Sequence, residues 1–127
     1  MDIEMQLKKR IAMISGATGG LGNIATKIFA EYGVKLALIS RDNEKLRKLS
    51  NTLDLPDENV LLQNVDISEP ESALKAVDST LDYFSQIDIY LHLVGGWVGG
   101  NPVTEVMQDD IESMLKQHLW STFFLTK

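Results

Sequence analysis

The residues best suited to chemistry are the glycines of the segment from Ser15 to Gly22, which reads Ser-Gly-Ala-Thr-Gly-Gly-Leu-Gly. An amphipathic helical pattern follows it, and the first N–H groups of a helix are unpaired and partly positive, which suits a phosphate. Gly16, Gly20 and Gly22 would let a pyrophosphate approach the backbone closely. A tight strand-to-helix turn also uses glycines, but the position of this one favours a nucleotide-binding turn. A P-loop is excluded because its Gly-Lys-Ser/Thr ending is missing.

A second candidate cofactor-binding position lies at the end of the next apolar run, where Arg41 follows Ser40. In dinucleotide folds an acid at this position binds the ribose 2′-hydroxyl, whereas an arginine accommodates a 2′-phosphate. A guanidinium is always charged and offers a planar fork of donors to a phosphate. The pair therefore predicts NADP as the cofactor in preference to NAD. The alternative is a surface arginine paired with Asp42 or Glu44.

Four short apolar runs must position these residues, and we predict a strand in each: Arg10–Ser15, Val34–Ser40, Asn59–Val65 and Ile87–Val94. A helical pattern follows every run, the last one from about Thr104 toward the C-terminus. Strict alternation of strands and helices predicts an α/β fold, a Rossmann-type parallel sheet with helices on both faces. Right-handed crossovers give the strand order 3-2-1-4.

Apolar residues at helical spacing form one stripe on each helix, and we expect the stripes of the second and third helices to face the core. The stripes are Leu21, Ile24, Ala25, Ile28 and Phe29 in the first helix, Leu46, Leu49 and Leu53 in the second, Leu74, Val77, Leu81 and Phe84 in the third, and Val106, Met107, Ile111, Met114, Leu115 and Leu119 in the fourth. We expect Gly33 to end the first helix in a left-handed conformation, and Asp42 and Ser68 to cap the second and third.

Length and composition limit the remaining possibilities. The 127 residues suit one domain, residues 1–127, and the net charge of −6 argues against a nucleic-acid or anionic-membrane binder. The absence of cysteine excludes disulfides and thiolate chemistry. No signal peptide or membrane-spanning run is apparent, so we expect a cytoplasmic protein.

With these motifs the chain resembles the short-chain dehydrogenase/reductase family. The family fingerprint, Thr/Ser-Gly-x-x-x-Gly-x-Gly, is matched by Ser15, Gly16, Gly20 and Gly22. The extended branch of the family has the motif Gly-x-x-Gly-x-x-Gly instead, and Gly16, Gly19 and Gly22 fit that motif as well. The single-domain branch is indicated by its Asp-Val and Ile-Asp-Ile landmarks, matched here by Asp66-Ile67 and Ile87-Asp88-Ile89.

The resemblance covers essentially the whole chain and implies a set of NADP-binding residues. These are Ser15, Gly16, Thr18, Gly20, Leu21, Gly22, Ser40, Arg41, Asp66, Ile67 and Gly95. Asp66 and Ile67 match the pair beside the adenine ring, and the alternative for Asp66 is a cap of the third helix.

The chain departs from the family after the fourth strand, where Asn-Asn-Ala-Gly is replaced by His92-Leu93-Val94-Gly95. We interpret His92 as a hydrogen-bonded core histidine and predict no metal site. His118 occupies the position at which the family's catalytic tetrad begins with an asparagine. We expect it either to hydrogen-bond a water molecule, as that asparagine does, or to be an ordinary residue on the helix surface. The family's catalytic serine and Tyr-x-x-x-Lys are absent, because no tyrosine has a lysine four residues later.

Complete relatives transfer a hydride between NADP(H) and a carbonyl or alcohol, and the chain resembles their first half. We therefore expect it to bind the dinucleotide and to be inactive alone, or to be a non-enzymatic nucleotide-binding or scaffold module. An uncovered edge beside the fourth strand and the stripe from Met107 to Leu115 predict a homo-oligomer or a complementary C-terminal half. Trp97 is expected either to cover the nicotinamide pocket or to anchor its loop.

Overall fold

The computed structural model of the chain describes residues 2–96 and 98–127, so the expectation for Trp97 lies outside the described residues. Four parallel strands form one sheet in the order β3-β2-β1-β4, which confirms the predicted topology. The strands are β1 (Ile11–Ser15), β2 (Lys35–Ser40), β3 (Val60–Asn64) and β4 (Ile89–His92).

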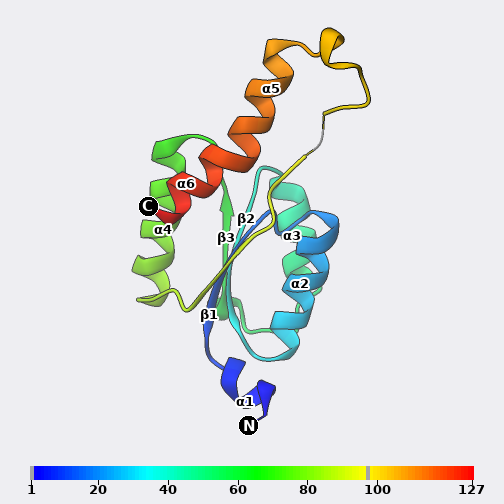
Figure 1. The fold of residues 1–127 in the computed structure, drawn as a ribbon. Coiled ribbons are helices and arrows are strands. Elements are labelled where there is room, and N and C mark those ends of the chain that lie inside the picture. The colour runs from blue at the N-terminus through cyan, green and yellow to red at the C-terminus, as the bar shows by residue number, and fades with distance from the viewer. Residues whose placement is uncertain (1, 97) are drawn as a thin grey trace.

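A helix follows each strand as predicted, and a short helix that the sequence did not predict precedes β1. The helices are α1 (Ile3–Leu7), α2 (Gly20–Glu31), α3 (Asn43–Asn51), α4 (Pro70–Phe84), α5 (Gln108–Leu115), a π-helical turn (η3, Lys116–Trp120) and α6 (Ser121–Thr126), with short 3-10 turns at η1 (Asp57–Asn59) and η2 (Val103–Glu105). One face of the sheet is covered by α2 and α3, and the other by α4 and α6 (Figure 1). None of the helices in the described ranges is long and apolar enough to cross a membrane.

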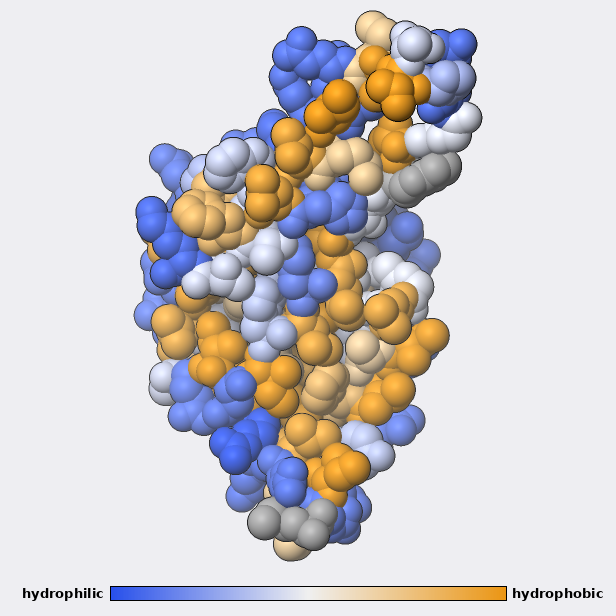
Figure 2. Space-filling model, viewed as in Figure 1, coloured by the Kyte–Doolittle hydropathy of each residue, from blue (hydrophilic) through white to orange (hydrophobic). Residues whose placement is uncertain are grey.

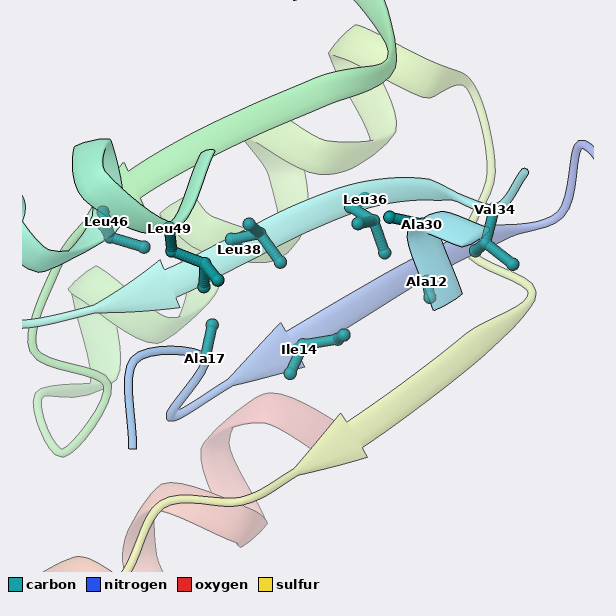
Figure 3. Close-up of a cluster of buried hydrophobic side chains, with 9 residues drawn as sticks. All are labelled: Ala12, Ile14, Ala17, Ala30, Val34, Leu36, Leu38, Leu46 and Leu49. Atoms are coloured by element: carbon teal, nitrogen blue, oxygen red, sulfur yellow. The ribbon is translucent and has the colours of Figure 1, made fainter. Parts of the chain in front are cut away.

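The core lies on both faces of β1 and β2, the two central strands. Every residue of β1 is buried, and so is every residue of β2 except Lys35, as expected for strands covered on both sides. Figure 3 shows the cluster on the side of α2 and α3, where Ile14 of β1 and Leu38 of β2 are fully buried. A second cluster, which includes Met13 and Ile39, faces α4 and α6.

The predicted buried stripe of α4 is partly wrong, and the apolar stripe of α2 is also partly exposed. In α2 the buried residues are Gly22, Thr26 and Ala30, whereas Leu21, Ile24 and Ile28 are exposed. In α4 the buried residues are Ala73, Ala76 and Thr80, whereas Leu74 and Leu81 are exposed. Small residues let a helix lie close against the sheet, and each helix therefore presents its small face inward while the large apolar residues lie on a neighbouring face.

The helix ends agree with the sequence in two of three cases. Gly33 has a φ of +71°, which a left-handed helix end requires. The Oδ1 atom of Asp42 accepts a hydrogen bond of 3.0 Å from the N–H of Lys45 and caps α3. Ser68 does not cap α4, because the helix begins at Pro70 and its N-cap is Glu69.

The contact between the start of α2 and the preceding turn predicts a test of the packing. A Cβ atom on Gly22 would collide with the carbonyl oxygen of Gly16, whereas one on Gly20 has no atom within 4 Å. We expect Gly22→Ala to lower the free energy of unfolding by about 1–3 kcal/mol, because backbone atoms would have to move.

Gly20→Ala is the matched control and should leave the stability unchanged or slightly raised, since alanine is the better helix former. Urea unfolding followed by circular dichroism measures both variants. Equal unfolding midpoints for the two would contradict the packing described here.

Candidate functional site

The carboxyl ends of all four strands border one open cleft. Its walls come from the glycine-rich turn, from the segments that follow β2, β3 and β4, and from the last helical stretch: Gly16, Thr18, Gly19, Ile39, Ser40, Arg41, Asp42, Lys45, Val65, Asp66, Ile67, Ser68, Leu93, Val94, Gly95, Gln117 and Ser121. The cleft spans the point between β1 and β4 at which the strand order reverses. Open α/β sheets bind their ligands at this topological switch point.

The turn after β1 is built around Gly16, whose φ of +70° favours glycine. A Cβ atom there would lie 2.5 Å from the carbonyl oxygen of Leu93 and 2.9 Å from the backbone nitrogen of Val94. The turn therefore packs directly on the chain leaving β4. The N–H of Gly19 donates to the carbonyl of Gly16 at 3.1 Å, which closes the turn.

The helix that follows begins without a side-chain cap, because its N-cap is Gly19. No side chain accepts a hydrogen bond from the N–H groups of its first turn, and Gly19 itself lines the cleft. Such a helix start is partly positive and can bind an anion such as a phosphate.

Thr18 joins this turn to the end of β2. Its Oγ1 atom lies 2.6 Å from Oγ of Ser40, and Ser40 Oγ also accepts a 3.1 Å hydrogen bond from the N–H of Asp42. The Ser40 carbonyl accepts a further bond of 3.0 Å from Asn64. The buried Ser40 is therefore a neutral, fully engaged group at the position where an acid would bind a ribose.

Arg41 lies on the rim of the cleft, and no ion pair involves it in the ranges that the structure describes. The two acids proposed as its alternative partners are engaged elsewhere. Asp42 caps α3 and lies 3.9 Å from Lys45, while Glu44 pairs with Lys48 at 3.1 Å.

Asp66 also lines the cleft, and its Oδ1 atom accepts bonds from the N–H and the hydroxyl of Ser68 at 3.0 and 2.7 Å. Partial burial opposes ionisation of the carboxyl, but these bonds and the charges of Arg41 and Lys116 outweigh it and lower the pKa of Asp66 below its ordinary value. Its neighbour Ile67 is buried in the core. Asp66 is therefore an anionic wall residue and does not cap α4.

Two histidines lie where the sequence departs from the family. Three hydroxyl groups, those of Ser15, Tyr90 and Ser121, surround the half-buried ring of His92, as the interpretation of a hydrogen-bonded core histidine requires. His118 lies in the π-helical turn, and its Nε2 atom is 2.8 Å from the carbonyl oxygen of Gly96. It therefore holds the segment leaving β4, although the side chain is exposed.

The structure brings most of the predicted residues to the cleft. Gly16, Thr18, Ser40, Arg41, Asp66, Ile67 and Gly95 line it. The other four do not: Ser15 is buried beneath the turn, Gly22 packs on Gly16, and Gly20 and Leu21 begin α2.

Sequence reasoning missed three polar lining residues, Lys45, Gln117 and Ser121. Lys45 lies in the first turn of the helix that Asp42 was expected to cap, so its nearness in sequence to Arg41 could have indicated a second cation at the same rim. Gln117 and Ser121 are also four residues apart, but only the packing of the last helix on the sheet reveals that they reach the cleft. Across residues 2–96 and 98–127 no three histidine, aspartate or glutamate side chains are grouped so as to hold a metal ion.

Known proteins match this arrangement. The short chain dehydrogenase family profile matches residues 10–127. The uncharacterized oxidoreductase Lmo0432 of Listeria monocytogenes is 27% identical over 111 residues, which cover 87% of this chain and 44% of that protein.

Two solved structures share the fold. The 3-ketoacyl-(acyl-carrier-protein) reductase of Brucella melitensis, complexed with NADH, has a TM-score of 0.84 and 24% identity over 94% of this chain and 48% of its own. ElxO with NADP bound has a TM-score of 0.83 and 20% identity over 93% of this chain and 48% of its own. The chain spans about half the length of these proteins, and it belongs to the short-chain dehydrogenase family.

Proposed function

We propose that this chain binds a nicotinamide dinucleotide, with the pyrophosphate at the glycine-rich turn and the start of α2. The observation that carries the proposal is the uncapped helix start behind a turn in which Gly16 allows close approach, at the switch point of a parallel sheet. The adenosine half would then lie toward Arg41 and Asp66, and the nicotinamide half toward the segment leaving β4.

We further propose a preference for NADP over NAD. Similar structures hold either cofactor, so this preference has to come from the residues of this chain. Arg41 has no acidic partner in the described ranges, and Lys45 contributes a second cation to the same rim. Ser40 adds no negative charge that would repel a 2′-phosphate. Asp42 weakens the field of these cations but is engaged as a helix cap.

The chemistry of the complete relatives is a hydride transfer, and a bound NADP(H) would exchange a hydride with a carbonyl or an alcohol. We propose that residues 1–127 bind the cofactor without catalysing this step. None of Tyr32, Tyr83 and Tyr90 is followed four residues later by a lysine, so no tyrosine here has the partner that would lower its pKa for proton transfer. The chain acts either as the cofactor-binding half of a reductase or as a non-enzymatic nucleotide-binding module.

We also propose that the isolated chain self-associates through the side of the sheet at β4. β4 is an edge strand of the sheet, and α2, which covers one face of the same sheet, exposes Leu21, Ile24 and Ile28. Figure 2 shows hydrophobic side chains gathered along the middle of this face and up along α5, where Met107, Ile111 and Leu115 are exposed. Edge strands and contiguous apolar patches favour association, and a complementary C-terminal half would compete for the same face.

The cofactor preference predicts the effect of reversing one charge. Arg41→Asp should weaken NADP+ binding at least about tenfold and tighten NAD+ binding, because the carboxylate repels the 2′-phosphate and accepts from a ribose hydroxyl. Arg47→Asp makes the same change in charge on the exposed surface of α3, outside the cleft, and should leave both affinities nearly unchanged. Isothermal titration calorimetry measures the constants. Equal affinity of the unmodified chain for NADP+ and NAD+ would refute the preference.

The association proposal predicts a dimer or larger assembly at micromolar concentration. Replacing Ile24 and Ile28 together by lysine should shift the chain toward monomer, because two charges would enter the apolar face. Ile3→Lys changes an exposed residue of α1 outside this face, and it should not shift the chain toward monomer. Sedimentation velocity measures the assembly, and a strictly monomeric profile of the unmodified chain would rule the proposal out.

A further inference from the structure

The ring of His92 joins the end of β1 and the strand β4 to the start of α6. Its Nδ1 atom lies 2.7 Å from Oγ of Ser15, the last residue of β1, and 2.6 Å from the hydroxyl of Tyr90 on β4. Its Nε2 atom lies 3.2 Å from Oγ of Ser121, the first residue of α6. Ser15 and Ser121 are completely buried, so these partners have no water to replace the ring.

The hydrogen bonds define which ring nitrogen carries the proton. The hydroxyl of Ser121 donates its single proton to the carbonyl of Gln117 at 2.6 Å, so Nε2 of His92 has to be the donor toward Ser121. Nδ1 then accepts from Tyr90 or Ser15. Burial raises the pKa of Tyr90 to about 12, and its hydroxyl therefore keeps the proton that it donates.

The ring is neutral in this arrangement. Its burial, together with the positive charge that the nearby His118 can carry, lowers the pKa of His92 below its ordinary value. A neutral imidazole with a proton on Nε2 satisfies the groups on both sides, whereas an aliphatic side chain would leave the Ser15 and Ser121 hydroxyls without this partner.

The partners of His92 are also parts of the cleft. Ser15 leads directly into the turn at Gly16, and Ser121 lines the wall beside Leu93, Val94 and Gly95. α6 is linked to β4 through this ring, and it follows a π-helical turn, a local irregularity that often occurs at functional sites. The bond between His92 and Ser121 therefore holds this wall to the end of β4, beside the packing of Leu125 and Phe124 of α6 in the core.

We propose that His92 is a positioning residue that fixes α6 against β1 and β4 and so shapes the wall that receives the nicotinamide half of the cofactor. This inference rests on the proposed dinucleotide function. His92 should not affect binding of the adenosine half. Among the described residues, Arg41 and Asp66, which lie at the adenosine end, make no hydrogen bond to His92 or to its hydroxyl partners.

The test compares two ligands on the same variants of the full chain. NADP+ occupies both ends of the cleft, whereas adenosine 2′,5′-bisphosphate occupies only the adenosine end. We expect His92→Leu to weaken NADP+ about tenfold, because the hydroxyls of Ser15 and Ser121 lose their shared partner, and to change the bisphosphate affinity less than about twofold.

Two further variants separate the hydrogen bond from the volume of the ring. His92→Gln can donate an N–H toward Ser121 and should recover part of the NADP+ affinity lost in His92→Leu. Ser121→Ala removes the partner on α6 and should weaken NADP+ in the same direction. Leu53→Ala, a partly buried change near the end of α3 that does not line the cleft, serves as the destabilised control and should leave the ratio of the two affinities unchanged.

Calorimetry and NMR distinguish the outcomes. Equal weakening of both ligands in His92→Leu, or no change in either, would overturn the inference while leaving the proposed function intact. If the unmodified chain binds neither ligand, the proposed function fails and the inference with it. Long-range 1H–15N spectra give a readout that does not need the cofactor: we expect the proton of His92 on Nε2, and a proton on Nδ1 would overturn the assignment.

Discussion

The arrangement depends on one close contact, that of the turn after β1 with the chain leaving β4. Gly16 leaves no room for a side chain against the backbone of Leu93 and Val94, and Gly22 leaves none against Gly16. Because these positions carry no side chain, the start of α2 packs closely on the turn, and no side chain caps its first N–H groups. The same contact fixes where β4 ends relative to β1, and hence where the cleft lies.

Hydrogen bonds between side chains then connect the walls of the cleft to this turn. Thr18 joins it to Ser40 at the end of β2, and Ser15 joins it to His92 at the end of β4. The first link belongs to the end that carries Arg41, and the second to the end that carries Ser121. Thr18 therefore holds the wall that would contact the adenosine half of a dinucleotide, and Ser15 holds the wall that would contact the nicotinamide half. Both residues belong to the same short segment around the turn.

The strand order and the motif positions follow from the sequence because they depend on local patterns. The apolar runs and Asp42 act within a few residues of their own positions, and the structure confirms the strands and the helix cap predicted from them. The inward faces of α2 and α4 could not be predicted in this way, because the small residues that pack on the sheet stand beside larger apolar ones. Ser121 escaped prediction for a related reason: its partner, His92, lies 29 residues away in the sequence.

The central claim is that the open amides at the start of α2 hold the diphosphate of a dinucleotide. A crystal structure of the chain grown with NADP+ tests it most directly. We predict electron density for the diphosphate within hydrogen-bonding distance of backbone nitrogens between Gly16 and Leu21, with the 2′-phosphate beside Arg41. A complex in which NADP+ lies elsewhere, or in which protein atoms fill this corner of the cleft, would contradict the account.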